Sequence, residues 1–384
     1  KIISRNRGRR RHISSSAMKI PAAVAVSLAV GARPSHAFFD IFKSVSFPPP
    51  TAAAPPADRV SLGTLSISPV GFGTLNLPLN KETDDDALEV MKSASAAGVN
   101  FVDTAEAYGF GASERLTAWA AGEAGLKLGG EDGDVRVATK FAPVPWRSGA
   151  ESVVEACAAS RDRLGVDAID LYQIHWPDII QPLKGLGIEN RKDELYWDGL
   201  ARCYETGLAR NVGVSNYGPS MIRKAHAYFA ERGVPLVSNQ INFSLLRYRS
   251  SLETLEVCNE LGIKVLGYFP LGNGVLAGKY SLEDPKTLPS FPKSLTMKKY
   301  LEGSAPLLDT LRDIANEKER SCAQVAVNWV TSKGVIPIPG CRNSAHAADN
   351  FGALEFRLTK EEVERLDKAS EASMEFSSGG FELE

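Results

Sequence analysis

The feature that most constrains the fold is a repeated alternation of short apolar runs with amphipathic segments, from Pro69 onward. The amphipathic segments carry apolar residues at helical spacing, whereas the runs are nearly continuous, as in strands buried on both faces. Strands separated by helices predict a parallel α/β sheet, and eight such units over residues 69–352 match the size of a (β/α)8 TIM barrel. The expected strands are 70–73, 99–103, 135–140, 169–175, 211–215, 236–240, 263–268 and 335–339, with helices near 84–97, 113–124, 150–164, 193–206, 218–232, 250–261 and 321–333.

Two of these helices have recognisable start signals. Thr83 precedes an acidic first turn, and Ser113 is followed by Glu114, so we expect both hydroxyl residues to cap helices. Ahead of the alternation, residues 60–67 read as a short hairpin around Gly63 and Thr64.

A doubly wound sheet is the competing architecture. Its dinucleotide-binding turn needs G-x-G-x-x-G directly after the first strand, but here Gly71 and Gly73 are followed by Thr74, Leu75 and Asn76. The barrel is therefore the preferred interpretation.

The amino-terminal 45 residues differ in composition from the rest of the chain. Residues 1–39 hold eight Lys/Arg and no Asp/Glu, and a short apolar stretch at 20–30 follows the Arg/Ser-rich start. This composition is typical of an organellar targeting segment, and the apolar stretch is too short to span a membrane stably. We expect a disordered plastid (chloroplast) transit peptide, with thylakoid association as a further option within the plastid. A mitochondrial transit peptide and a bacterial-type secretory signal are the alternatives. The signal is expected to be incomplete because the chain begins with Lys1.

These observations predict three parts: a targeting segment at 1–45, a Pro/Ala-rich linker at 46–57 and a barrel domain at 58–384. From residue 40 onward, 36 basic residues face 46 acidic ones, and so acidic a domain argues against nucleic acid as a partner. Five scattered cysteines without a C-x-x-C pair favour a reduced compartment, and the spacing of the histidines argues against a metal site. The sequence indicates no oligomeric state.

Titratable residues follow successive predicted strands, where a barrel enzyme carries its chemistry. Asp103 ends the second strand, Lys140 the third and His175 the fourth, while Tyr108 lies five residues beyond Asp103. A phenol with a neighbouring ammonium suits proton donation to a carbonyl oxygen, because the cation stabilises the phenolate. We therefore expect Lys140 and Asp103 to lower the pKa of Tyr108, and His175 to orient the carbonyl. Each residue alone also has an ordinary structural explanation; their occurrence at successive strand ends favours the catalytic one.

At this point a family can be recognised. The motifs Asp103-Thr-Ala-Glu-Ala-Tyr108-Gly, Ala138-Thr-Lys140, Gln173-Ile-His175-Trp, Val212-Gly-Val-Ser215-Asn216 and Ile336-Pro-Ile-Pro-Gly340 resemble those of the aldo-keto reductase superfamily. The resemblance extends from about Val60 to Leu366 and is greatest to an uncharacterised plastid-type oxidoreductase branch. It implies a barrel closed at its bottom by the 60–67 hairpin, a small-molecule carbonyl substrate, and reduction by NADPH (oxidised to NADP+).

The resemblance also implies roles for individual residues. Asp103, Tyr108, Lys140 and His175 form the implied catalytic tetrad. Ser215, Asn216 and Gln240 match positions that hold the nicotinamide carboxamide, and Tyr268 matches the aromatic residue that stacks on the ring. The remaining implied cofactor-binding residues are Thr74, Leu271, Gly272, Gly274, Gly278 and Lys279, with Gly340, Arg342, Asp349 and Asn350 on the 2′-phosphate and adenine side.

Two positions depart from the family pattern. Phe269 stands where many members have a small hydroxyl residue, and Leu75 where others often have an aromatic one. Both leave the cofactor affinity and the identity of the substrate open. The apolar wall of the pocket is expected to be formed by Leu75, Trp146 and Trp176.

The sequence thus predicts an NADP-dependent carbonyl reductase. An NADPH-sensing regulatory or scaffold barrel with little turnover is the alternative, and a lyase or isomerase using Lys140 as a Schiff base is a third hypothesis. The 285–293 stretch is expected to be a lid or a plain surface loop.

Overall fold

The structure is a computed structural model that describes residues 59–78, 83–130, 133–179 and 191–375. The predicted targeting segment (1–45) and linker (46–57) lie outside the described residues, so these domain boundaries stay predictions.

Eight parallel strands form one sheet in chain order. They are β3 (Phe72–Gly73), β4 (Phe101–Asp103), β5 (Arg136–Phe141), β6 (Leu171–Ile174), β7 (Val212–Ser215), β8 (Leu236–Asn242), β9 (Lys264–Tyr268) and β10 (Ile336–Pro337). The first and last strands also meet, since the amides of Gly71 and Gly73 donate to the carbonyls of Pro337 and Pro339 at 3.0 Å. The predicted (β/α)8 barrel is therefore confirmed.

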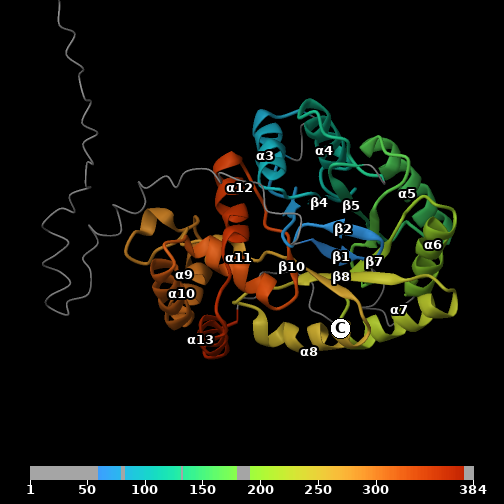
Figure 1. Cartoon of the computed structure of the whole chain (residues 1–384). Coiled ribbons are helices and arrows are strands. Elements are labelled where there is room, and N and C mark those ends of the chain that lie inside the picture. Colours follow the sequence, from blue (N-terminus) through green and yellow to red (C-terminus); the bar gives the residue numbers. More distant parts are fainter. Residues whose placement is uncertain (1–58, 79–82, 131–132, 180–190, 376–384) are drawn as a thin grey trace, which may run out of the picture. The chain divides into compact units, whose positions relative to one another are not determined.

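Helices surround these strands (Figure 1). Those expected from the sequence are α3 (Asp85–Ala96), α4 (Ala112–Glu123), α5 (Ala150–Leu164), α6 (Asp193–Glu205), α7 (Pro219–Glu231), α8 (Tyr248–Glu260) and α11 (Cys322–Ser332). Four more were not predicted: α9 (Lys293–Gly303), α10 (Ala305–Glu317), α12 (Ser344–Phe351) and α13 (Lys360–Glu371). The 285–293 stretch, expected as a lid or loop, holds a short 3-10 turn, η4 (Pro285–Thr287), and the start of α9.

Both predicted helix caps were misplaced. The N-cap of α3 is Asp84, whose carboxylate accepts from the amide of Ala87 at 3.2 Å. Ser113 lies inside the first turn of α4, and its hydroxyl hydrogen-bonds the hydroxyls of Thr74 and Thr104 instead. A tertiary partner for the side chain thus replaced the local cap.

The predicted hairpin is present as β1 (Val60–Leu62) and β2 (Leu65–Ile67), which pair antiparallel. Gly63 occupies the turn at φ +58°, and the next amide, of Thr64, donates to Oδ1 of Asn211 at 2.9 Å. Asn211 immediately precedes β7, so this bond ties the turn to the amino-terminal end of the strands. The hairpin side chains Leu62, Leu65 and Ile67 pack on residues inside the barrel.

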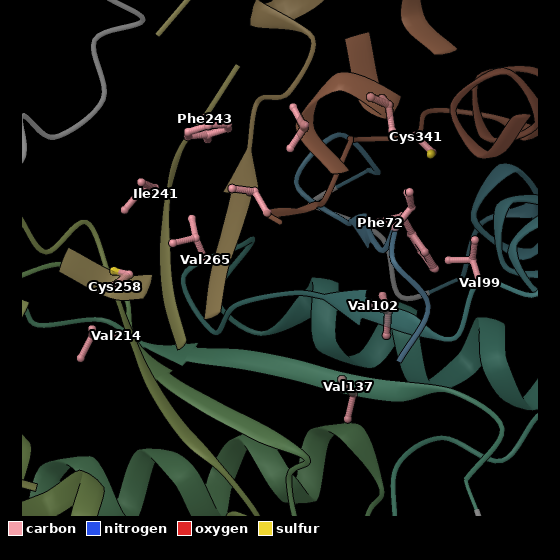
Figure 2. Close-up of a cluster of buried hydrophobic side chains, with 14 of the residues drawn as sticks. Phe72, Val99, Val102, Val137, Val214, Ile241, Phe243, Cys258, Val265 and Cys341 are labelled. Atoms are coloured by element: carbon pink, nitrogen blue, oxygen red, sulfur yellow. The ribbon is translucent and has the colours of Figure 1, made fainter. Parts of the chain in front are cut away.

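The alternation of side chains along each strand divides the core in two. Phe101 and Ala138 belong to the cluster inside the barrel, whereas their neighbours Val102 and Val137 belong to the cluster between strands and helices. Figure 2 shows Val102 and Val137 in this outer cluster. Because successive side chains alternate, the residues two positions after Phe101 and Ala138, Asp103 and Lys140, share the inward orientation.

Candidate active site

Asp103 and Lys140 form a buried ion pair at the carboxyl ends of β4 and β5. Nζ of Lys140 donates to Oδ1 of Asp103 at 2.5 Å and to the carbonyl of Thr104 at 2.8 Å. Burial alone would lower the pKa of Lys140, but the charge of Asp103 and the neighbouring Tyr108 outweigh it and raise the pKa. Lys140 is therefore a fully buried ammonium ion.

Tyr108 lies beside this pair, in the loop between β4 and α4. Its ring centroid is 5.2 Å from Nζ of Lys140 and 5.6 Å from the ring of His175, which it meets edge-on. Burial raises the pKa of Tyr108 above its ordinary value, and Lys140 acts in the opposite direction without overcoming burial. The expectation of a lowered phenol pKa is therefore wrong, because desolvation of the phenolate outweighs the nearby cation.

His175 follows β6 and is neutral. Burial, with a smaller contribution from the charge of Lys140, lowers its pKa well below the usual value. Its Nδ1 atom has no hydrogen-bond partner among the described residues. Its backbone is held at both ends, since its amide donates to Phe141 and its carbonyl accepts from Nδ2 of Asn216 at 2.9 Å. A neutral imidazole carries one N–H and can donate a hydrogen bond without being an acid at neutral pH.

A cavity of about 210 Å³ opens above these groups. Asp103, Tyr108 and His175 line it, while Lys140 is fully buried and not part of the lining. The other lining residues are Gly73, Leu75, Asn76, Ser215, Asn216, Gln240, Tyr268, Phe269, Ile338 and Gly340. The structure thus brings all four tetrad candidates and the four nicotinamide candidates to one place.

The carboxamide candidates are already hydrogen-bonded to the protein. Nε2 of Gln240 donates to Oδ2 of Asp103 at 2.8 Å, and Oγ of Ser215 donates to the carbonyl of Gln240 at 2.8 Å. The Tyr268 hydroxyl donates to Oδ1 of Asn216 at 2.8 Å. A ligand here would meet residues oriented in advance, and Gln240 additionally supports the carboxylate of the ion pair.

A second cavity, of about 440 Å³, shares Asn76, Phe269 and Gly340 with the first. Its walls include most of the predicted phosphate and adenine residues: Leu271, Gly274, Lys279, Gly340, Arg342, Asp349 and Asn350. The two cavities are therefore adjacent, one holding the tetrad candidates and the other Arg342.

The residues of this second cavity suit a dinucleotide phosphate. Lys279 and Arg342 supply positive charge, and the backbone at Gly272, Asn273 and Gly274 has positive φ values of 52°, 55° and 95°. The amides of Gly272 and Gly274 donate to the carbonyls of Phe269 and Leu271, at 2.9 Å each, so Lys279 and Arg342 are the groups of this region that suit an anion. Asp349 and Asn350 have protein partners of their own, the Ser321 hydroxyl and the Cys341 thiol.

Some predicted residues lie elsewhere. Thr74 is buried and hydrogen-bonds Asp103 and Ser113 instead of lining either cavity, and Gly272 and Gly278 also lie outside both linings. Trp146 and Trp176 do not line the pocket either, and Trp146 is 80% exposed, so only Leu75 of the expected wall is found. Conversely, Asn76, Ile338, Asn273 and His346 line the cavities without having been predicted.

The described residues contain no group of three or more His, Cys, Asp or Glu arranged to hold a metal ion. None of their helices is both long and apolar enough to cross a bilayer.

Comparison with known proteins gives a consistent result. The model of the Aldo/keto reductase family matches residues 69–371. The chain is 43% identical over 331 residues to the chloroplastic pyridoxal reductase of Arabidopsis thaliana, covering 83% of this chain and 87% of that protein. It is 31% identical over 330 residues to a probable aldo-keto reductase of Glycine max, covering 81% and 88%.

Solved structures agree. The glycerol dehydrogenase of Gluconobacter oxydans superposes with a TM-score of 0.65 at 23% identity, covering 85% of this chain and 99% of that one, and it supports the fold alone. An aldo-keto reductase of Bombyx mori in complex with NADP has a TM-score of 0.60 at 25% identity, covering 83% and 94%. The chain is therefore an oxidoreductase that belongs to the aldo-keto reductase family.

Proposed function

We propose that this protein reduces an aldehyde or ketone to an alcohol with NADPH. The observation that carries the proposal is the convergence of Tyr108, the Lys140–Asp103 pair and His175 at one cavity, which adjoins a second cavity lined by Lys279 and Arg342. NADPH, when bound, supplies the hydride that the carbonyl carbon accepts. Ser215, Asn216, Gln240 and Tyr268 would hold its nicotinamide end, and Lys279 and Arg342 its phosphates.

In this proposal, Tyr108 gives its phenolic proton to the carbonyl oxygen as that oxygen gains negative charge. The phenol is protonated at neutral pH, as a proton donor must be, because even its ordinary pKa lies near 10. The ammonium of Lys140, held by Asp103, stabilises the phenolate that results, and water then restores the proton. The neutral His175 donates a hydrogen bond that orients the carbonyl oxygen.

The structure argues against a Schiff-base role for Lys140. A Schiff base requires a neutral amine, whereas Lys140 is fully buried, paired with Asp103 and has a raised pKa.

Pyridoxal is the substrate we propose, since a 43% identical relative is a pyridoxal reductase. Pyridoxal is a flat aromatic aldehyde, and Leu75, Phe269 and Ile338 provide an apolar wall for such a ring.

We also propose a plastid location, which is supported by the name of the same relative and by the basic, acid-free amino terminus. Nothing comparable supports thylakoid association or the mitochondrial alternative, and neither is part of the proposal.

Steady-state turnover tests the proposal. Purified full-length protein is mixed with NADPH or NADH and a panel of aldehydes that includes pyridoxal, and both the loss of reduced cofactor and the alcohol product are measured. We expect many turnovers, a lower KM for NADPH than for NADH, and conversion of pyridoxal to its alcohol. Oxidation of one NADPH per protein molecule across the whole panel would instead favour the NADPH-sensing barrel.

A further inference from the structure

Glu106 lies two residues before Tyr108 and reaches across to the neighbouring strand. Its Oε1 accepts a hydrogen bond from the backbone amide of Ala142 at 2.7 Å. Both of its oxygens accept from the guanidinium of Arg147, including Nη2 to Oε2 at 3.0 Å. The Glu106 side chain is only 10% exposed, so these charge-assisted contacts are poorly screened by solvent.

Arg147 is itself held in place. Its Nη1 donates to the carbonyl of Ala142 at 3.1 Å, and its guanidinium lies 4.7 Å from the ring centroid of Phe141. Its own carbonyl accepts from Nζ of Lys192 at 3.0 Å and from the hydroxyl of Tyr196 at 2.9 Å. The partner of Glu106 is therefore anchored both to the end of β5 and to the α6 region.

These contacts join the two segments that carry the proposed proton donor and its cation. Phe141 and Ala142 directly follow Lys140 along the chain, and Glu106 directly precedes Ala107 and Tyr108. A loop residue fixed to the strand of Lys140 limits how far the Tyr108 ring can drift from Nζ. Polar ties of this kind hold a reacting group near its working geometry, where a displacement of 1 Å can cost about 100-fold in rate.

We propose that Glu106, clamped by Arg147 and the Ala142 amide, is a positioning residue that sets the placement of Tyr108 against Lys140. The inference rests on the proposed function, in which Tyr108 is the proton donor. Glu106 is absent from the lining of both cavities, so it acts through Tyr108 and not on substrate or cofactor.

Kinetics of three variants test the inference. Glu106→Ala removes every contact, and we expect kcat to fall about 10- to 100-fold while KM for NADPH stays within about twofold. Glu106→Gln keeps an oxygen that can accept from the Ala142 amide, so its loss should be smaller. Arg147→Met should lower kcat like Glu106→Gln, and combining it with Glu106→Ala should add less than about twofold, because residues of one network are not additive.

The pH profile separates positioning from a merely structural role. A Tyr108 that has moved away from Lys140 loses that cation's lowering effect on the phenol pKa, so the basic limb of kcat in Glu106→Ala should shift to higher pH. The matched control is Glu260→Gln, which breaks a comparable two-bond pair with Arg223 on the exposed surface (3.1 and 2.6 Å). It should change neither kcat nor the profile.

A spectroscopic readout does not depend on activity. With tyrosine labelled by 13C at Cζ, the signal of Tyr108 is the one absent in Tyr108→Phe. We expect this signal to shift or broaden in Glu106→Ala and to stay in place in Glu260→Gln. If the wild type reduces no aldehyde, the proposed function fails, and this signal still decides the placement of Tyr108. Folded Glu106→Ala with an unchanged Tyr108 signal, or with wild-type kcat in an active enzyme, would overturn the inference.

Discussion

The two ends of the barrel strands differ in what their polar groups do. At the amino-terminal end, the hairpin packs Leu62 and Ile67 inside the barrel, and Asn211 is hydrogen-bonded to Thr64 and Asp170. At the carboxyl-terminal end, Nδ1 of His175 is buried without a partner in the described structure. This carboxyl-terminal end, the mouth of the barrel, also holds Asn216 and Phe269 at positive φ values of 63° and 50°.

The comparison shows how one set of strands serves two purposes. At the amino-terminal end, which the hairpin closes and which is called the closed end here, hydrogen-bonded polar groups and apolar contacts stabilise the fold. Both ends bury charge, but at the closed end the Asp170 carboxylate accepts from the amides of Gly130 and Val137. The mouth additionally carries an unpartnered imidazole and backbone conformations unfavourable for side chains, which cost stability. Such costs are typical of sites arranged for chemistry, and the predicted effects of mutation should divide accordingly.

Tyr108→Phe, a change at the mouth, should give the largest effect, a loss of activity with little loss of stability. Removing the hydroxyl eliminates the proposed proton donor, so kcat should fall by about 10²- to 10⁴-fold. The aromatic ring stays, so the free energy of unfolding should change by less than about 1 kcal/mol and NADPH should still bind. Carbonyl reduction kinetics, NADPH titration and urea unfolding measure the three quantities. Wild-type turnover in this variant would rule out Tyr108 as the acid.

Ile67→Ala should lower stability and leave activity nearly unchanged. Ile67 is fully buried in β2, and its truncation leaves a cavity, so the free energy of unfolding should fall by about 2–5 kcal/mol. The kcat of the folded fraction should stay within about twofold, because the hairpin lies at the other end of the strands. Urea unfolding and active-site-normalised kinetics at 25 °C test both statements. A large loss of kcat in a fully folded sample would show that the closed end also controls the site.

Most elements of the fold, and the convergence of three site residues, could be predicted from the sequence. Seven helices, the strands and the hairpin were foreseen, because continuous apolar runs and helical periodicity carry that information locally. The convergence of Asp103, Lys140 and His175 followed from barrel geometry once they were placed at strand ends. The α13 helix was missed although Thr359 and Glu362 form a capping box, a signal that the sequence does contain.

Contacts across the barrel could not be predicted. The bond from Gln240 to Asp103 joins residues 137 positions apart and depends on side-chain distances that no local pattern encodes. Likewise, Glu106 was visible in a motif, but its partner Arg147 was not. The sign of the net pKa shift of Tyr108 also depended on burial, which periodicity does not measure for a loop residue.

Arg342→Ala should sharpen the division within the mouth itself. Arg342 lines the second cavity, away from the tetrad candidates, and a charge-assisted contact to the 2′-phosphate would be lost. We expect the Kd for NADPH to rise about 10- to 100-fold and the Kd for NADH to change less than about twofold. Fluorescence titration with each cofactor gives both values. Equal losses for the two cofactors would mean that Arg342 does not read the 2′-phosphate.

Replacing His175 should give the smallest predicted effect, a change in how the free energy of unfolding depends on pH. Its pKa is lowered in the folded protein, mainly by burial, from an ordinary value of 6.5. As the pH falls below about 6.5, the unfolded chain binds a proton at this residue that the folded protein does not, so the folded state loses stability until its own lowered pKa is reached. One proton contributes at most about 1.4 kcal/mol per pH unit to this slope. His175→Asn removes the titrating group, so urea unfolding between pH 5 and 7 should show a weaker pH dependence than the wild type. Identical slopes in the two proteins would mean that the buried imidazole is not held neutral, and the mouth would then resemble the closed end more than the structure indicates.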